Sequence, residues 1–132
     1  MNKREYAQHN KEWLTAKSKE EGVKNLANGV YYKVLEESKQ TGMKPGVRSI
    51  VTVHYTGKTI DGKLFDSSKG GVPLACRVCD LIEGWIVALQ QMQVGDRWEI
   101  YVAAEMGYGK FSQPGIPGGS TLIFEIELLG IA

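Results

Sequence analysis

Residues 49–66, SIVTVHYTGKTIDGKLFD, contain the pattern that decides the fold. Apolar and polar residues alternate over 49–56, which is the period of a half-buried β-strand and places Tyr55 on the same face as the two valines before it. The dipeptide Asp61-Gly62 that follows is a strong signal for a tight turn. This stretch therefore predicts a strand, a turn and the start of a further antiparallel segment.

Three other segments have the same alternating character and are predicted to be strands: residues 30–35, 97–102 and 121–129. Residues 41–46, which contain glycine and proline, are predicted to connect the strand at 30–35 to the strand at 49–56. Apolar residues recur at helical spacing around Trp85 over 82–92, which predicts one short helix. Residues 103–120 are rich in glycine and contain prolines, so we expect a long ordered loop, a kind of segment that often carries function. The chain is predicted to be an α+β protein with an antiparallel sheet.

The N-terminal region differs from the rest. Residues 3–21 lack proline and glycine and are rich in helix formers, so they predict a helix that ends near Gly22. Its apolar stripe consists of Tyr6, Trp13 and Leu14. Because this stripe is too thin to form a core alone, we expect the helix to pack on the rest of the protein, on its counterpart in a homodimer, or on a client protein.

A short connector, residues 22–29, is expected between this helix and the strands. The chain is thus divided into an N-terminal helix with its connector, residues 1–29, and one domain over 30–132. A chain of 132 residues with 42% apolar residues is long enough for one such domain and too short for two ordinary ones.

The charge of the chain is almost balanced, with 16 Lys and Arg residues against 15 Asp and Glu residues. No net field therefore favours nucleic acid or an anionic membrane, and neither is expected as a partner. No apolar run approaches the length of a signal-peptide core or a membrane span. We expect a soluble protein that is cytoplasmic by default, or periplasmic if the chain is a processed or truncated form.

Cys76 and Cys79 form a C-x-x-C pattern, which invites a redox or metal-binding interpretation. Thioredoxin-like chemistry needs this motif at the start of a helix, and zinc needs two further ligands. Neither His9 nor His54 has a suitable spacing, and the surrounding residues indicate a strand that leads into a turn. We interpret the two residues as ordinary half-buried thiols and expect no metal site.

Six short motifs follow one another in separated places. They are Val53-His54-Tyr55-Thr56-Gly57, Leu64-Phe65-Asp66-Ser67-Ser68, Leu81-Ile82-Glu83-Gly84-Trp85, Gly107-Tyr108-Gly109, Pro114-Gly115-Ile116-Pro117 and Thr121-Leu122-Ile123-Phe124-Glu125. Each motif is weak evidence alone, but in order and spacing the six resemble the FKBP-type peptidyl-prolyl cis-trans isomerases over about residues 30–130. Residues 16–35 also resemble the junction before the isomerase domain in the bacterial Mip-like branch of that family.

The resemblance implies a half-open antiparallel β-barrel wrapped around the short helix, with Trp85 as the floor of a pocket for a prolyl ring. The backbone N–H of Ile82 and the hydroxyl of Tyr108 would donate to substrate carbonyls, and Asp66 would lie at the rim near the twisting amide. The implied catalytic set is Tyr55, Asp66, Ile82 and Tyr108, and the implied substrate-binding set is Phe65, Leu74, Cys76, Leu81, Trp85, Ile116 and Phe124.

A structural interpretation of single residues stands beside this one. Phe124 alternates with core positions of a strand, Trp85 would suit a core, and Asp66 could cap the turn at Ser67-Ser68. The functional interpretation rests on the joint pattern. The chain also departs from the family after Pro73, where many relatives carry bulky aromatic residues and this chain has Leu74 and Cys76. One pocket wall should therefore be thinner, with weaker binding of macrolide inhibitors.

Proline isomerisation needs no nucleophile, metal or cofactor, because its barrier of roughly 18–20 kcal/mol comes from amide resonance and no covalent bond breaks. A dry apolar pocket favours the twisted amide, which is less polar than the planar one. The resemblance therefore predicts an enzyme that acts on proline-containing polypeptides. The alternative is a non-catalytic client-binding or chaperone module that uses the same groove.

Overall fold

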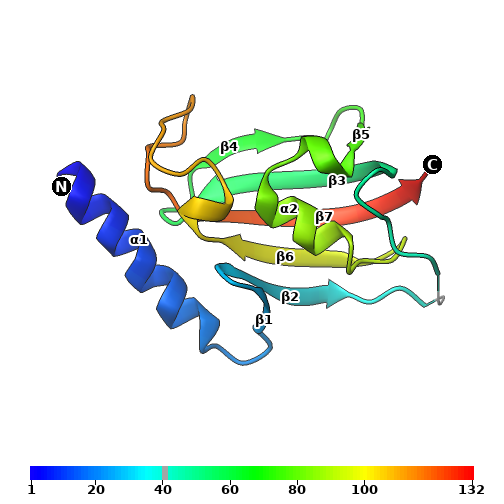
Figure 1. Cartoon of the computed structure of the whole chain (residues 1–132), viewed down its shortest axis with the longest axis horizontal. Helices are drawn as coiled ribbons and strands as arrows, with labels where there is room; N and C mark the ends of the chain where they lie inside the picture. Colours follow the sequence, from blue (N-terminus) through cyan, green and yellow to red (C-terminus); the bar gives the residue numbers. More distant parts are fainter. Residues whose placement is uncertain (40–41) are drawn as a thin grey trace.

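The computed structural model describes residues 1–39 and 42–132, so the first position of the connection predicted at 41–46 lies outside the described residues. Figure 1 shows two helices and an antiparallel sheet in this part of the chain. The helices are α1 (Lys3–Ser18) and α2 (Glu83–Leu89), with the short 3-10 turns η1 (Val78–Asp80) and η2 (Ala104–Met106). The strands are β1 (Lys24–Ala27), β2 (Val30–Glu36), β3 (Ile50–Thr59), β4 (Leu64–Ser67), β5 (Leu74–Arg77), β6 (Arg97–Val102) and β7 (Leu122–Ile131).

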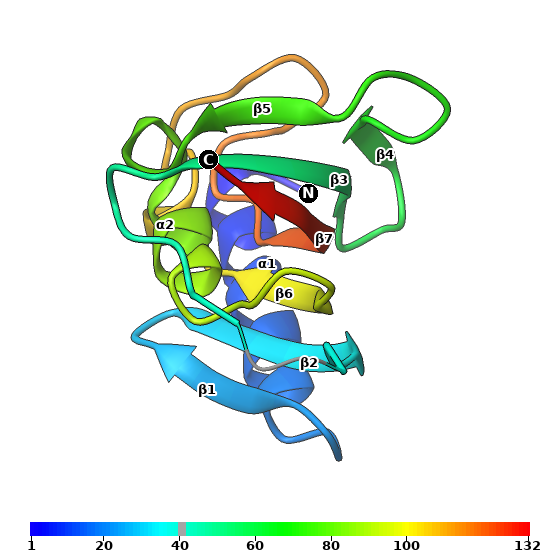
Figure 2. The ribbon, with the colours of Figure 1, turned by 90° about the vertical axis from the view of Figure 1, so that its right-hand side faces the viewer.

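The seven described strands form one sheet in the order β1-β2-β6-β7-β3-β4, and β5 also pairs with β3. Every pairing is antiparallel. Strand β3 is long enough to pair with β7 along one edge and with both β4 and β5 along the other. The sheet curves around α2 without closing, as Figure 2 shows from the end of the molecule. The predicted α+β class and the half-open antiparallel barrel are confirmed.

The main core lies between α2 and the concave face of the sheet. Buried residues of β6, such as Ile100 and Val102, face this core, whereas Tyr101 between them faces the opposite side. Gly84 lets α2 approach the sheet closely, because a Cβ atom there would lie 2.6 Å from Cγ1 of Val102. The helix ends at Leu89, short of the predicted 92, but Met92 in the turn that follows is still fully buried in this core.

Helix α1 packs on the convex face. Its Leu14 is buried with Tyr101 and Ile123, and the ring of Trp13 lies 6.1 Å from that of Tyr101, centroid to centroid. Of the three packing partners considered for this helix, the structure therefore shows contact with the barrel. In Figure 1 α1 runs diagonally across the end of the sheet, beside the loop that precedes β7. Among the described residues, no helix is both long and apolar enough to cross a membrane.

Two predicted boundaries at the N-terminus are wrong. Helix α1 ends at Ser18 instead of residue 21, because the chain turns there towards the sheet and reaches the left-handed region at Gly22, with φ +85°. The predicted connector 22–29 contains strand β1, which pairs with β2. The turn between them contains Asn28-Gly29, with Gly29 at φ +82°, and this dipeptide is a hairpin signal that the interpretation as a connector overlooked.

Candidate functional site

A cavity of about 280 Å³ opens beside α2. Residues from seven segments line it: Tyr55 of β3, Phe65 and Asp66 of β4, Leu74 of β5, Asp80, Leu81 and Ile82 from η1 and the turn before α2, Trp85 of α2, Tyr108 of the loop after η2, and Phe124 of β7. Larger hollows of about 530 and 570 Å³ flank α1. The smaller cavity is the candidate site because the aromatic residues of the separate motifs meet there.

Four aromatic rings form the inner part of this cavity. Trp85 is almost fully buried and meets the rings of Tyr55 and Phe124 edge to face, each at 5.2 Å between centroids. Phe65 meets Phe124 in the same way at 5.7 Å. Edge-to-face pairs of this kind add to the stability that burial provides. The rings are therefore held in a fixed arrangement with Trp85 at its base.

Gly57 makes room for these rings. A Cβ atom at this position would lie 2.7 Å from atoms of both Phe65 and Phe124, which real Cβ contacts essentially never reach. Any side chain here would push at least one ring out of place. The glycine that follows Tyr55 and Thr56 in the first motif is thus required by the aromatic wall on the neighbouring strands.

Tyr55 and Asp66 are joined at the rim of the cavity. The Tyr55 hydroxyl donates to Oδ2 of Asp66 over 2.6 Å. Burial, followed by this hydrogen bond and the charge of Asp66, raises the pKa of Tyr55 from 10.0 to about 12. The hydroxyl therefore stays protonated near neutral pH and keeps its role as a donor.

The serines after Asp66 fix the backbone of Tyr55. Oγ of Ser68 accepts from the Tyr55 N–H over 2.8 Å, and the Ser68 N–H donates to the Tyr55 carbonyl oxygen over 2.9 Å. Oγ of Ser67 donates to the same carbonyl oxygen over 3.3 Å. The Ser67-Ser68 pair, for which the sequence offered only a turn, therefore holds β3 and the end of β4 together at the site.

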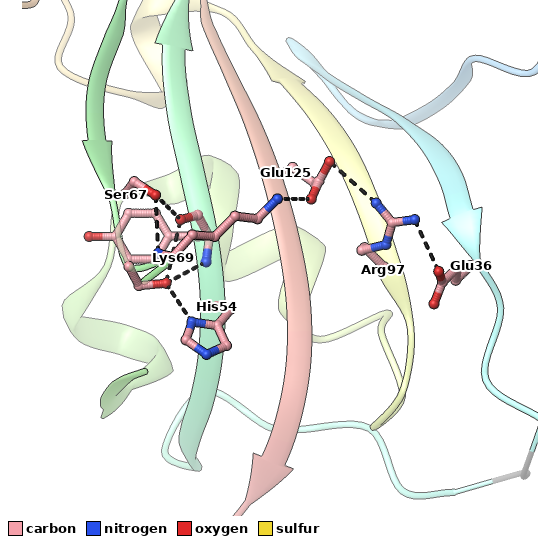
Figure 3. A network of polar contacts seen from close by, with 8 residues as sticks. Glu36, His54, Ser67, Lys69, Arg97 and Glu125 are labelled. Carbon is pink, nitrogen blue, oxygen red and sulfur yellow. Dashed lines mark hydrogen bonds and ion pairs between the residues drawn. The ribbon is translucent and has the colours of Figure 1, made fainter. Parts of the chain in front are cut away.

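His54 lies next to this contact but does not line the cavity. Its Nδ1 is 2.9 Å from Oγ of Ser68. Figure 3 marks this contact of the labelled His54 with a dashed line. The same figure shows ion pairs that link Lys69 to Glu125 over 2.8 Å, and Arg97 to both Glu125 and Glu36 over 3.3 and 3.1 Å. The two ion pairs of Arg97 join β6 to β2 and β7. All three pairs are at least partly exposed to solvent, so each adds little stability.

Two donors at the cavity are free to bind a ligand. The Ile82 N–H and the Tyr108 hydroxyl make no hydrogen bond to any residue within 1–39 and 42–132. Ile82 lies at the N-cap of α2, and its carbonyl oxygen accepts from the N–H groups of Trp85 and Ile86. Tyr108 is 36% exposed on the loop above the cavity. Both groups can therefore donate to carbonyl oxygens of a bound peptide.

Two of the eleven predicted site residues do not line the cavity. Cys76 is half-buried opposite Val51 and packs against the core, and Ile116 is 5% exposed within the same core. Leu74 does line it, so the predicted thin wall is at this position. Asp80 also lines the cavity and was missed, because an acidic residue in a turn after Cys79 gave no sign of the direction of its side chain.

The described residues contain no group of three or more His, Cys, Asp or Glu side chains that could hold a metal ion. Cys76 and Cys79 are free thiols; Cys76 is half-buried as predicted, but the prediction is wrong for Cys79, which is exposed in η1 after the end of β5. Burial, with a smaller effect of the Asp80 charge, raises the pKa of the Cys76 thiol. A raised pKa disfavours the reactive thiolate, so the geometry supports the interpretation of Cys76 as a structural residue.

Comparisons with known proteins agree with this geometry. Residues 41–129 match the family described as FKBP-type peptidyl-prolyl cis-trans isomerase. The chain is 41% identical over 127 residues to the peptidyl-prolyl cis-trans isomerase Mip of Coxiella burnetii, covering 95% of this chain and 54% of that protein. It is 42% identical over 121 residues to the outer membrane protein MIP of Legionella longbeachae, covering 90% of this chain and 51% of that protein.

A solved structure is similar over the whole chain. The crystal structure of a peptidyl-prolyl cis-trans isomerase from Pseudomonas syringae pv. tomato has a TM-score of 0.91 and 31% identity, and the match covers 100% of this chain and 97% of that one. The two Mip proteins are longer, and the chain spans about half the length of these curated relatives.

Proposed function

We propose that this chain, which belongs to the FKBP-type peptidyl-prolyl cis-trans isomerase family, catalyses rotation about X–Pro bonds in peptides and folding proteins. The observation that carries the proposal is the cavity beside α2, where four packed aromatic rings form the inner part and Ile82 and Tyr108, which have free donors, belong to the lining. Such rotations are slow enough to limit folding, so an enzyme that accelerates them is useful to other proteins.

The chemistry follows from the polarity of the amide. A planar amide is stabilised by resonance, and the twisted amide loses that resonance and becomes less polar. An apolar cavity above Trp85 therefore binds the twisted form better than water does, which lowers the barrier. The prolyl ring would rest on Trp85, between Tyr55 and Phe124, while the bond before it rotates.

The polar groups would hold the substrate during the rotation. The Ile82 N–H and the Tyr108 hydroxyl would each donate to a substrate carbonyl oxygen. Asp66 would lie at the rim near the rotating amide, where its bond from Tyr55 fixes the direction of the carboxylate. No proton needs to leave or enter the substrate, so these groups orient the peptide and stabilise its charge distribution.

Partners and location follow from the same family. Proline-containing polypeptides are the proposed substrates, and macrolide inhibitors would occupy the same cavity. A homodimer through α1 would have to use the face of that helix opposite Leu14, because Leu14 is buried against the sheet. The L. longbeachae relative is named an outer membrane protein, which favours the periplasmic alternative over the cytoplasmic default.

Protease-coupled isomerisation of a short proline peptide tests the proposal. We expect catalysis by the full chain that rapamycin inhibits, and a loss of about fivefold to tenfold in kcat/KM for Tyr108→Phe, which removes one hydrogen bond. Tyr32→Phe is the matched control, since Tyr32 stacks on Trp98 away from the cavity. Peptide binding without catalysis would instead support the client-binding module.

A further inference from the structure

Asn10 of α1 makes hydrogen bonds that a helix on a protein surface does not need for its own stability. The residue is 1% exposed, and its Oδ1 accepts from the backbone N–H of Thr121 over 2.8 Å. Its backbone oxygen accepts from Oγ1 of Thr121 over 3.2 Å, and its Nδ2 donates to the carbonyl oxygen of Tyr6 over 2.8 Å. Asn10 therefore joins α1 to the residue just before β7.

A second contact lies one turn earlier in the helix. The Tyr6 hydroxyl is 2.7 Å from Oγ of Ser120, which in turn donates to the carbonyl oxygen of Pro117 over 2.6 Å. Ala7 packs so closely on Gly119, at φ +83°, that a Cβ atom there would lie 3.0 Å from the Cβ of Ala7. The helix thus holds residues 117–121 through both hydrogen bonds and close packing.

Residues 117–121 in turn hold the segment that carries Tyr108. The Gly119 N–H donates to the carbonyl oxygen of Gly109 over 2.8 Å, and the Gly109 N–H donates to that of Ala104 over 2.7 Å. Gly118 packs directly on Lys110, where a Cβ atom would lie 2.2 Å from the carbonyl oxygen. A continuous series of contacts therefore leads from α1 to Gly109 and Lys110, which directly follow Tyr108.

Docking of α1 alone does not explain this arrangement. Leu14 and Trp13 already supply apolar contact with the sheet. Burying an amide is unfavourable unless its hydrogen bonds are satisfied, and when they are satisfied it specifies one geometry in place of many. The side-chain oxygen of Asn10 accepts its hydrogen bond from one backbone N–H of the loop, that of Thr121. This bond therefore fixes the position of the loop relative to the helix.

We propose that Asn10 is a positioning residue for the isomerase reaction: through Thr121 it fixes the loop that presents the Tyr108 hydroxyl to the substrate. The proposal rests on the proposed function, in which Tyr108 binds a substrate carbonyl. It gives the N-terminal helix a part in the site, although every predicted pocket residue lies after Thr52 in the sequence.

The effect should fall on substrate affinity. If the loop is ordered for only a fraction of the time, the apparent affinity is reduced by that fraction. We therefore expect Asn10→Ala to raise KM by about threefold to tenfold while kcat stays within about twofold. Gln8→Ala is the matched control, because Gln8 lies on the exposed face of the same helix and bonds only to Glu12 among the described residues.

A double-mutant cycle separates positioning from general destabilisation. Asn10 and Tyr108 belong to different segments, and the hydrogen bonds of Asn10 go to Tyr6 and Thr121, so independent effects of the two substitutions on kcat/KM should multiply. We expect Tyr108→Phe to lose less activity in the Asn10→Ala background than in the wild-type chain, because the loop has already left its position. Effects that multiply to within about twofold would overturn the proposal.

A second measurement does not depend on activity. Amide hydrogen exchange at Gly109 and Gly119 should become faster in Asn10→Ala, with amides of β3 unchanged and with no change in Gln8→Ala. Unchanged exchange at both glycines in a folded variant would overturn the proposal even if the enzyme is active.

Thr121→Val provides a second variant if Asn10→Ala does not fold. It removes only the hydrogen bond of the Thr121 hydroxyl and should give a smaller change in exchange in the same direction. No change in exchange in this variant would contradict the inference. An inactive wild-type chain would sink the proposed function while the exchange result still decides whether α1 holds the loop.

Discussion

The two helices lie on opposite faces of one sheet and are held there by different forces. Helix α2 buries Trp85, Ala88 and Leu89 in the main core, and Gly84 brings its backbone close to β6. Helix α1 is more than twice as long, with 16 residues against 7, yet only Asn10 and Leu14 are buried. Apolar packing therefore holds α2 and builds the cavity, whereas α1 combines a small apolar contact with hydrogen bonds to one loop.

The length of a helix is therefore no measure of its contribution to the stability of the fold. Most helical stability in proteins comes from packing of the apolar face. The short helix should therefore contribute more to global stability, and the long one should act mainly on the position of the loop before β7. Substitutions of equivalent residues on the two helices test this difference.

The largest effect is expected at Trp85. Its replacement by alanine removes the floor of the cavity and leaves a void in the main core, so Trp85→Ala should cost about 3–5 kcal/mol of unfolding free energy and most of the isomerase activity. Urea unfolding and the peptide assay measure the two losses. Trp85→Phe keeps a flat ring and should retain more of both; equal losses for the two variants would contradict the role of the ring as a floor.

A leucine on each helix gives a direct comparison. Leu89 of α2 is fully buried in the main core, and Leu14 of α1 is 7% exposed in the smaller cluster. We expect Leu89→Ala to lower the unfolding free energy by about 4 kcal/mol and Leu14→Ala by about 2 kcal/mol. Urea unfolding of both variants checks this order. A larger loss for Leu14→Ala would mean that α1 is part of the main stabilising core.

The cavity wall formed by β5 is the next place to test. Leu74 lines the cavity where many relatives have an aromatic residue, so Leu74→Phe should add rigid contact area for a bulky ligand. We expect it to tighten rapamycin binding by on the order of 1–2 kcal/mol, about tenfold or somewhat more in affinity. Titration of rapamycin against both proteins measures this. An unchanged affinity in a folded variant would show that position 74 does not contact the inhibitor.

The smallest effect concerns pH. The pKa of Tyr55 is raised to about 12, and neither His9 nor His54 is among the cavity residues. The value of kcat/KM should therefore vary by less than about twofold between about pH 6 and 8. A steep bell-shaped profile centred near neutrality would argue for a histidine role, although no histidine is among the described residues that line the cavity.

The same pKa shift predicts how stability changes in alkali. The folded-state pKa of Tyr55 lies above its ordinary value of 10.0, so its contribution is fully present below that value and is lost as the pH rises towards about 12. The difference in unfolding free energy between wild type and Tyr55→Phe should therefore shrink over this range. A difference that is constant between pH 9 and 11.5 would argue against the shift.

The sequence predicted the features that depend on regular patterns. Alternation identified β2, β3, β6 and β7, and helical spacing around Trp85 identified α2. Tyr55, Phe65 and Phe124 come together at one cavity because they lie on β3, β4 and β7, which are neighbours in the sheet. The α+β class and the family could therefore be obtained without coordinates.

The remainder depends on contacts that no periodic pattern encodes. Cys76 lies two residues after Leu74 on the same strand, and Ile116 lies in one of the six motifs. Both side chains nevertheless pack in the core and do not line the cavity. Asp80 reaches the cavity only because η1 turns the chain. Asn10 lies outside the apolar stripe predicted for the N-terminal helix, and its burial depends on a contact with Thr121, 111 positions later in the chain.

The central claim is that the cavity on the concave face catalyses rotation and does more than bind proline. NMR exchange spectroscopy of a short proline peptide at equilibrium tests it most directly, because it measures cis–trans interconversion without a coupled protease. With a catalytic amount of the full chain, we expect exchange peaks between the cis and trans resonances on a subsecond timescale, against tens to hundreds of seconds without enzyme, and their suppression by rapamycin. Shifts of the Trp85 indole resonance that show peptide binding, with no acceleration of this exchange, would contradict the account.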